Sequence, residues 1–288
     1  MIRLIVSDLD GTLLDEPNSI SKTNLDAIDY AYKKGARFGF ATGRDLANVD
    51  SIKGLLNQEP LLILGNGAVI YDGEGNIVGE DFFPNQYLEE VTQILSSYDV
   101  PHMIFTTDGF YTTTDPGEVK GRFVERLAAL ASKEIAQIYD TDPGKPCNNL
   151  VQITDMDAFV RTKKIIKVEG FHLKSAPVEA AKKELERYTE LSHLSTGKNN
   201  VEVTNITAQK GLALKKYIER VGIAADEVMV LGDSYNDMSL FDNFKYSFAP
   251  ENSCPEIRAK AYRVVKSCKE HGVSQAIYEC LGMQTMCR

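Results

Sequence analysis

The sequence lacks a long apolar run, an excess of positive charge, and any internal repeat or low-complexity segment. No apolar stretch reaches the roughly 20 residues that a membrane-spanning helix needs, so we expect no membrane partner. Lysine and arginine together number 32 against 41 aspartates and glutamates, which gives a net charge of -9. Because nucleic-acid binding depends on basic side chains that neutralise phosphates, we expect no nucleic-acid partner either. A local basic pocket for a small anion is compatible with this balance.

Histidine and cysteine are also scarce, with four and five residues. The cysteines are odd in number and show no CxxC or other zinc-ligand spacing, which favours reduced thiols in a cytoplasmic protein. The amino terminus enters an apolar strand at once, without the pattern of a signal peptide, and this supports the same localisation. The histidines lie outside the motifs described below, so we expect carboxylates to carry out any proton transfer.

The first third of the chain alternates predicted strands and helices. The composition is that of an ordinary globular protein, and 288 residues suffice for two modest cores. Apolar strands are predicted at residues 2–7, 36–44 and 60–70, with helices at 21–35 and 45–57 between them. This βαβαβ order predicts a parallel, doubly wound sheet with right-handed crossovers.

After a predicted hairpin at residues 71–78, the pattern changes to that of an α+β segment. Within this segment we expect, among other elements, one long helix over 119–138 and a strand over 191–196. Beyond it the first pattern resumes. We therefore predict an α/β protein with a core formed by residues 1–83 and 198–288 and an α+β insertion at 84–197.

Two aspartates end the first predicted strand, in the stretch DLDGT. Residues two apart in a strand face the same side, about 7 Å apart, so Asp8 and Asp10 are predicted to project together. Burying carboxylates is costly unless a metal ion or a hydrogen-bond network stabilises them. Ligands of open α/β sheets bind at the carboxyl ends of the strands, where these residues lie. Gly11 allows a sharp turn there, and Thr12 offers a hydroxyl group.

Two further predicted strands also end in polar residues. The second strand ends in ATGR, which we expect to place Thr42 and Gly43 at the start of the following helix, where free N–H groups favour an anion. Arg44 either contacts a substrate or pairs with a carboxylate, and both interpretations stay open. The third strand ends in GNGA, where Asn66 beside a glycine favours a simple turn over a direct substrate contact.

A fourth polar cluster, GDSYND, follows the strand predicted at residues 227–231. Asp233 and Asp237 are four residues apart, a spacing that places both on one side of a helix if one begins there. Lys210 stands at the start of the preceding helix. Carboxylates gathered this closely need a cation, and oxygen ligands without histidine or cysteine favour Mg²⁺. The lysine, the threonine and the backbone amides suit a phosphate group.

The motifs DLDGT, ATGR, Lys210 and GDSYND, in that order, resemble the four motifs of the haloacid dehalogenase superfamily of phosphotransferases. The insertion between the second and third motifs, together with NGA, resembles the Cof-type branch, class IIB, with a C2B-type cap. The resemblance spans nearly the whole chain. It implies a Rossmann-like, doubly wound parallel-sheet core and an inserted α+β cap domain at residues 84–197.

The resemblance also implies catalytic roles for these residues. Asp8 is expected to act as the nucleophile and to form an aspartyl-phosphate. Asp10 is expected to protonate the leaving alcohol and then to activate water. Donors from the later motifs are expected to hold the phosphoryl oxygens, namely Thr42, Gly43, Lys210 and Asn236.

Mg²⁺ is the cofactor that the resemblance implies. Its expected ligands are Asp8, the backbone carbonyl of Asp10, and Asp233. The expected supporting residues are Asp237, Arg44 and Asn66. One stretch departs from the family pattern, because FAPENSCPEI stands where the family often has AMxNA after the fourth motif. Asn252 can occupy the asparagine position of that pattern.

The predicted function is Mg²⁺-dependent hydrolysis of a small phosphate monoester through an aspartyl-phosphate. The expected partner is a small phosphorylated metabolite, either a sugar phosphate or a phosphorylated cofactor. Two alternatives stay open. One is a phosphomutase resembling phosphomannomutase, which would return the phosphoryl group to a sugar, and the other is a phosphate-ligand sensor without turnover. We favour hydrolysis because the cap and the length fit the Cof-type branch better.

Overall fold

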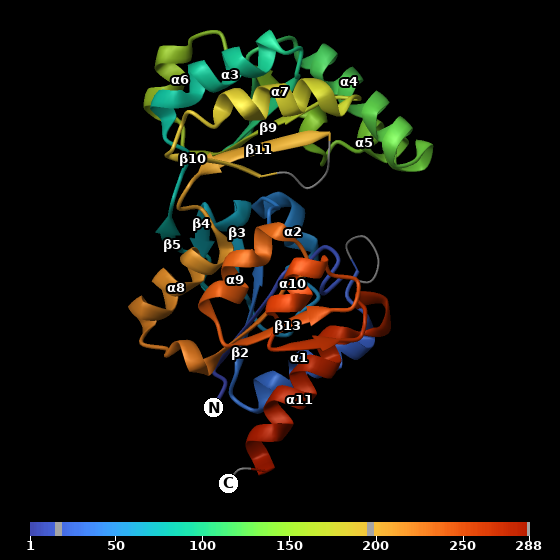
Figure 1. The fold of residues 1–288 in the computed structure, drawn as a ribbon, viewed down its shortest axis with the longest axis vertical. Helices are drawn as coiled ribbons and strands as arrows, with labels where there is room; N and C mark the ends of the chain where they lie inside the picture. Colours follow the sequence, from blue (N-terminus) through green and yellow to red (C-terminus); the bar gives the residue numbers. More distant parts are fainter. Residues whose placement is uncertain (15–18, 195–198, 287–288) are drawn as a thin grey trace. The chain divides into compact units, whose positions relative to one another are not determined.

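The chain divides into two compact units (Figure 1). The core unit consists of Met1–Asp81 and Thr207–Arg288, and the inserted unit is the continuous stretch Phe82–Ile206. The first is an α/β unit on a mainly parallel sheet, and the second is an α+β unit on its own sheet. The predicted fold, a Rossmann-like core with an inserted α+β cap domain, is confirmed. The computed structural model describes residues 1–14, 19–194 and 199–286.

The core sheet positions the candidate site. Within the described ranges it has eight strands, in the order β14-β13-β12-β1-β2-β3-β4-β5. Strands from β14 to β3 run parallel, whereas β4 and β5 are antiparallel and form the predicted hairpin. Strands β1, β3 and β12 are buried along their whole length, as expected for the middle of a sheet covered on both faces. The strands are β1 (Leu4–Ser7), β2 (Arg37–Ala41), β3 (Leu61–Leu64), β4 (Val69–Tyr71), β5 (Ile77–Glu80), β12 (Val228–Leu231), β13 (Tyr246–Pro250) and β14 (Arg263–Val265).

Helices cover the core sheet on both faces. One apolar cluster joins α8, α9 and α10 to the sheet face that carries Val6 and Val230. The intervening Ile5 is equally buried, so the opposite face is covered as well. The N-cap side chain of Ser21 accepts a hydrogen bond from Asn24 N at 3.2 Å, which confirms the predicted start of the first helix. The helices are α1 (Lys22–Lys33), α2 (Leu46–Lys53), α8 (Lys210–Val221), α9 (Met238–Asn243), α10 (Pro255–Lys260) and α11 (Gly272–Met286), with 3₁₀ turns η1 (Gly65–Gly67), η4 (Ala225–Glu227), η5 (Tyr235–Asp237) and η6 (Cys268–Glu270).

The inserted unit has a six-stranded sheet among its described residues, in the order β10-β11-β9-β6-β7-β8. Its neighbouring strands are antiparallel except for β7 and β8. The strands are β6 (His102–Thr106), β7 (Phe110–Thr112), β8 (Leu150–Gln152), β9 (Ile165–Phe171), β10 (Leu191–Leu194) and β11 (Asn200–Asn205). The helices are α3 (Leu88–Ser97), α4 (Pro116–Leu130), α5 (Lys133–Thr141), α6 (Met156–Thr162) and α7 (Ser175–Leu185), with 3₁₀ turns η2 (Asn85–Tyr87) and η3 (Pro146–Asn148).

Two predictions for the insertion need correction. The core was predicted to resume at residue 198, but β11 pairs with β9 and β10 and so belongs to the inserted unit, which extends to Ile206. The single helix predicted over 119–138 is two helices, because Ser132 has extended backbone and its side chain accepts from Ile135 N at 3.2 Å, which starts α5. The strand predicted over 191–196 is present as β10, and its last two residues lie outside the described ranges.

No helix in the described part of the chain combines the length and the apolar character that a bilayer crossing requires.

Candidate active site

Three polar loops leave the sheet side by side at the carboxyl ends of adjacent strands. Ser7, the last residue of β1, pairs in parallel with Leu231, the last residue of β12, and β2 flanks β1 on its other side. Asp8 follows β1 directly, Thr42 follows β2, and Asp233 comes two residues after β12. The core unit therefore brings these three motifs together at the carboxyl ends of its parallel strands, as the sequence predicts.

Lys210 and two aspartates form a buried ion triad. The Nζ atom of Lys210 donates to Asp8 Oδ1 and to Asp237 Oδ1, each at 2.6 Å. The Lys210 and Asp237 side chains are both fully buried. Gly211 allows the first turn of α8 to pack closely against α9, because a Cβ atom at this position would lie 2.0 Å from the carbonyl oxygen of Ser239. The glycine directly after Lys210 is the only sequence feature that is compatible with this close approach, and the motifs described above do not predict it.

Asp237 organises the loop that carries Asp233. Its Oδ2 atom accepts from Asp233 N at 2.9 Å and from Ser234 N at 3.1 Å. The condition for the predicted arrangement, a helix that begins at Asp233, is not met, because Asp233 precedes the 3₁₀ turn η5 and Asp237 ends it. Since both oxygens of Asp237 are engaged, this side chain holds Lys210 and the loop backbone in place.

Asp233 lies against the turn that follows Asp8. Thr12 Oγ1 donates to Asp233 Oδ1 at 2.9 Å. Gly11 has a left-handed backbone with φ of 82°, and a Cβ atom there would lie 2.6 Å from Asp233 Oδ2. Asp8, Asp233 and Asp237 each offer an oxygen, and these oxygens lie within 4.8 Å of one another.

Burial and mutual repulsion shift the pKa values in this cluster. Burial raises the pKa of Asp8 well above its usual range, Lys210 counteracts this, and the charges of Asp237 and Asp233 add to it. Burial, together with the charge of Asp237, raises the pKa of Asp233 to about 6. Burial disfavours the charge of Lys210, but the two aspartates outweigh it and raise the lysine pKa. The cluster is therefore short of positive charge, and its all-oxygen donor set fits a hard divalent cation such as Mg²⁺.

Asp10 points to a different partner from Asp8. Its carboxylate is held in a bidentate pair by Arg44, with Nε donating to Oδ2 at 2.8 Å and Nη2 donating to Oδ1 at 2.6 Å. Of the two interpretations left open for Arg44, the structure contains the carboxylate pair. The Asp10 side chain is 60% exposed, which makes it the accessible carboxylate of the first motif.

The ATGR segment differs from its prediction. Helix α2 starts after Asp45, whose side chain caps it by accepting from Asn48 N at 3.0 Å. Thr42 and Gly43 therefore lie in the turn before the helix, and their amides do not form its first turn. Thr42 Oγ1 accepts from Arg44 N at 3.2 Å within this turn.

Asn66 does more than form a turn. Its Oδ1 atom accepts a hydrogen bond from Asn236 Nδ2 at 3.1 Å, which joins the loop after β3 to the fourth motif. The side chain of Asn252 likewise bridges loops, donating to Gly11 O at 2.8 Å and accepting from Cys268 N at 2.9 Å. The stretch that departs from the family pattern thus still supports the loop of Gly11.

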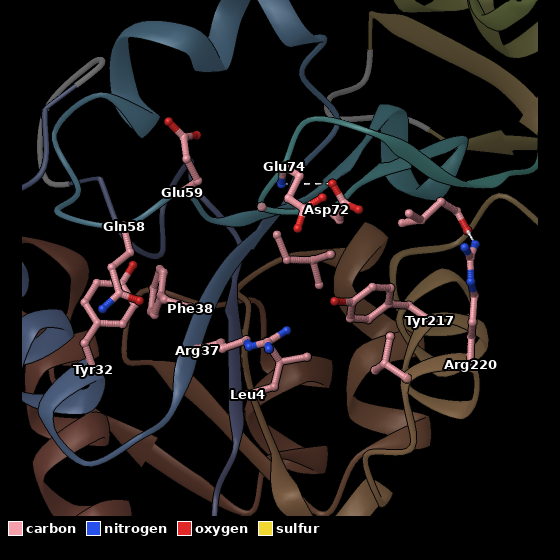
Figure 2. Close-up of a pocket in the computed structure, with 14 residues that line it drawn as sticks. Leu4, Tyr32, Arg37, Phe38, Gln58, Glu59, Asp72, Glu74, Tyr217 and Arg220 are labelled. Atoms are coloured by element: carbon pink, nitrogen blue, oxygen red, sulfur yellow. Dashed lines mark hydrogen bonds between the residues drawn. The ribbon is translucent and has the colours of Figure 1, made fainter.

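A separate cavity of about 420 Å³ opens at the amino ends of the core strands, away from the cluster around Asp8 (Figure 2). Its lining includes Leu4 and Arg37, the first residues of β1 and β2, together with Tyr217 of α8. None of the predicted site residues lines it. This cavity is therefore distinct from the cluster around Asp8.

A family model described as haloacid dehalogenase-like hydrolase matches residues 5–277. The chain belongs to this family. It is 27% identical to phosphatase YwpJ of Bacillus subtilis (strain 168), over 97% of this chain and 100% of that protein. It is 28% identical to the 5-amino-6-(5-phospho-D-ribitylamino)uracil phosphatase YwtE of the same strain, over 98% of this chain and 99% of that protein.

A solved structure of a haloacid dehalogenase-like hydrolase from B. subtilis superimposes with a TM-score of 0.80 at 26% identity, covering 96% of this chain and 99% of that one. The predicted membership of the superfamily, and of its Cof-type branch, is confirmed. The chain is a hydrolase of this family, and its curated relatives place it among the phosphatases.

Proposed function

We propose that this enzyme is a Mg²⁺-dependent phosphatase that hydrolyses a small phosphate monoester through an aspartyl-phosphate on Asp8. The observation that carries the proposal is the buried cluster in which Lys210 holds one oxygen of Asp8 at 2.6 Å beside Asp233. A buried carboxylate fixed at one oxygen by a lysine presents its other oxygen in a defined direction. This is the arrangement that a nucleophile needs.

The reaction divides between two aspartates. An oxygen of Asp8 forms a bond to phosphorus while the ester P–O bond breaks, and the departing alcohol oxygen takes a proton from Asp10. Water then attacks phosphorus and gives a proton to Asp10, and the bond between Asp8 and phosphorus breaks to release phosphate. The exposure of the Asp10 side chain supports its role, because this group must meet both the leaving alcohol and the water.

The phosphoryl oxygens are bound by donors around Asp8. Lys210 supplies a full positive charge, and Thr42, Gly43 and Asn236 supply neutral donors from the neighbouring loops. Such donors stabilise the charge that the equatorial oxygens carry in the transition state.

Asp8, Asp233 and the backbone carbonyl of Asp10 would hold the magnesium ion. When bound, it would neutralise charge on the phosphoryl group and on the two carboxylates. Asp237 supports this site without ligating the ion, since its oxygens are taken by Lys210 and by two backbone N–H groups. Arg44 holds the carboxyl group of Asp10 in a fixed orientation.

The substrate is a small phosphorylated metabolite, a sugar phosphate or a phosphorylated cofactor. The name of the relative YwtE, a phosphatase for a phosphorylated ribitylamino-uracil, supports this class.

The proposal is tested with Asp8→Asn, measured on p-nitrophenyl phosphate in the presence of MgCl₂. We expect turnover to be abolished while the circular dichroism spectrum stays unchanged. Retained turnover would refute Asp8 as the nucleophile. Incubation of the wild type with a panel of phosphorylated metabolites then separates hydrolysis, which releases free phosphate, from a mutase, which yields an isomerised sugar phosphate.

A further inference from the structure

Asn66 combines a left-handed backbone with a buried side chain beside the site. Its φ and ψ are 60° and 21°, and only 2% of the residue is exposed. Gly65 and Gly67 on either side are also left-handed, with φ of 58° and 110°. Glycine adopts this conformation more easily than any L-residue, so the backbone gives no reason for a side chain at this position. The reason must lie in the carboxamide.

The carboxamide of Asn66 fixes that of Asn236. Asn236 Nδ2 donates to Asn66 Oδ1 at 3.1 Å, and Asn236 Oδ1 accepts from Ser234 Oγ at 2.7 Å. Both polar atoms of Asn236 are thus held. An amide nitrogen carries two N–H groups. One donates to Asn66, and the second, which has no acceptor among the described residues, is available to a ligand.

Asn66 is itself anchored to the loop after β2. Its backbone N–H donates to Thr42 O at 2.9 Å, and Gly65 N donates to Arg44 O at 3.1 Å. Gly43 leaves room for the side chain, since a Cβ atom there would lie 3.1 Å from Asn66 Oδ1. Asn66 therefore links the loop after β2 to the loop after β12, and β1, which leads into Asp8, lies between those two strands.

We propose that Asn66 is a positioning residue that orients the carboxamide of Asn236 toward the phosphoryl group. This inference rests on the proposed phosphatase function. It assigns to Asn66 a task that acts through another side chain, so its effect on catalysis must disappear when Asn236 is absent.

The test is a double-mutant cycle with Asn66→Gly and Asn236→Ala, assayed with p-nitrophenyl phosphate. Glycine keeps the left-handed backbone and removes only the carboxamide. We expect Asn66→Gly to lower kcat/KM about fivefold, the equivalent of one hydrogen bond, and to weaken competitive inhibition by inorganic phosphate to a similar extent. In the Asn236→Ala background the same change should lower kcat/KM less than about twofold.

The double-mutant cycle also distinguishes a positioning role of Asn66 from a defect in folding. A defect in folding would persist in the Asn236→Ala background, whereas an effect transmitted through Asn236 vanishes there. His271→Gly is the matched control, because His271 is another left-handed residue of the core unit, with φ of 62°, outside the site. It should keep the wild-type kcat/KM.

The outcomes separate the two proposals. Wild-type activity in Asn66→Gly, or the same fold-loss in both backgrounds, overturns the positioning role and leaves the phosphatase function standing. Absence of phosphate release by the wild type from every ester tested overturns the proposed function itself.

Discussion

Lys210 and Asp8 form a 2.6 Å ion pair across 202 positions of sequence, with the lysine side chain fully buried and that of Asp8 only 6% exposed. The same nitrogen binds Asp237 at 2.6 Å. A buried charge that loses its partner is far more costly than an exposed one. The lysine is therefore needed for stability, in addition to the phosphate binding proposed for it above.

We predict that Lys210→Met abolishes turnover and lowers the free energy of unfolding by roughly 3–5 kcal/mol at about pH 8, because two buried carboxylates lose their cation. The loss of stability should be smaller at a lower pH, because burial raises the pKa of Asp8 and acid favours its uncharged form, which needs no cation. Urea unfolding at the two pH values measures this. Lys215→Met, an exposed position on the same helix, is the control and should leave both quantities unchanged. An active Lys210→Met enzyme would contradict the assignment.

A second prediction concerns two glycines with the same backbone conformation. Gly11 and Gly35 have φ of 82° and 84°, but a Cβ atom at Gly11 meets Asp233 Oδ2 at 2.6 Å, whereas one at Gly35 meets nothing within 4 Å. Alanine at either position should cost about 1–2 kcal/mol of unfolding free energy through backbone strain. Only Gly11→Ala should also lower the activity and weaken Mg²⁺ binding, because it displaces Asp233. Equal activity in the two variants would show that the contact with Asp233 is unimportant.

The third prediction is a pH dependence that magnesium changes. Burial raises the folded-state pKa of Asp233 to about 6, and an unfolded aspartate titrates near ~3.9. Between these values the folded, metal-free protein binds more protons than the unfolded chain. The contribution of Asp233 to the free energy of unfolding therefore falls as the pH rises through this window. Mg²⁺ binds the deprotonated carboxylate, so the stabilisation that it adds should grow as the pH rises.

Melting temperatures measured across this pH window, with EDTA and with MgCl₂, check the prediction. Asp233→Asn isolates the contribution of this carboxylate, because the amide does not titrate. The gain in melting temperature from MgCl₂ should increase with pH in the wild type and be lost in the variant. A gain that is independent of pH in the wild type would show that Asp233 does not ligate the ion.

The sequence predicts most of the site because the site is local to strand ends. Asp8, Thr42 and Asp233 each follow an apolar strand of the core sheet, and parallel strands bring their carboxyl ends together. This pattern, an apolar strand followed directly by a polar motif, can be recognised in the sequence despite the long spacing between the motifs and the insertion that separates them.

Long-range contacts are what the sequence does not predict. The alternating strand Asn200–Asn205 has the same pattern whichever sheet it joins, and its pairing with β9 decides its unit. The contact of Asn66 with Asn236 spans 170 positions and has no local signal. The choice of Asp10 as the partner of Arg44 depends on side-chain geometry that residue types alone leave open. In each case the deciding partner lies far away in the sequence.

The fourth prediction concerns Asp10, whose carboxylate is exposed and paired with Arg44. If Asp10 protonates the leaving oxygen, the contribution of Asp10 to kcat/KM must increase with the basicity of that oxygen. p-Nitrophenolate is a weak base that departs without much assistance, whereas a sugar alkoxide requires a proton. We expect Asp10→Asn to lower kcat/KM by about 10²–10⁴ for the metabolite phosphate that the wild type hydrolyses best. The loss with p-nitrophenyl phosphate should be much smaller.

The parameter kcat/KM suits this comparison, since it reports on the steps through cleavage of the ester bond and excludes the later attack of water. Arg44→Gln provides the matched variant, because it keeps the Asp10 carboxylate and removes the guanidinium that holds it. This variant should lower kcat/KM less than Asp10→Asn does for the metabolite phosphate. If Asp10→Asn lowers kcat/KM by the same factor for both esters, the proton that the leaving group needs comes from another source.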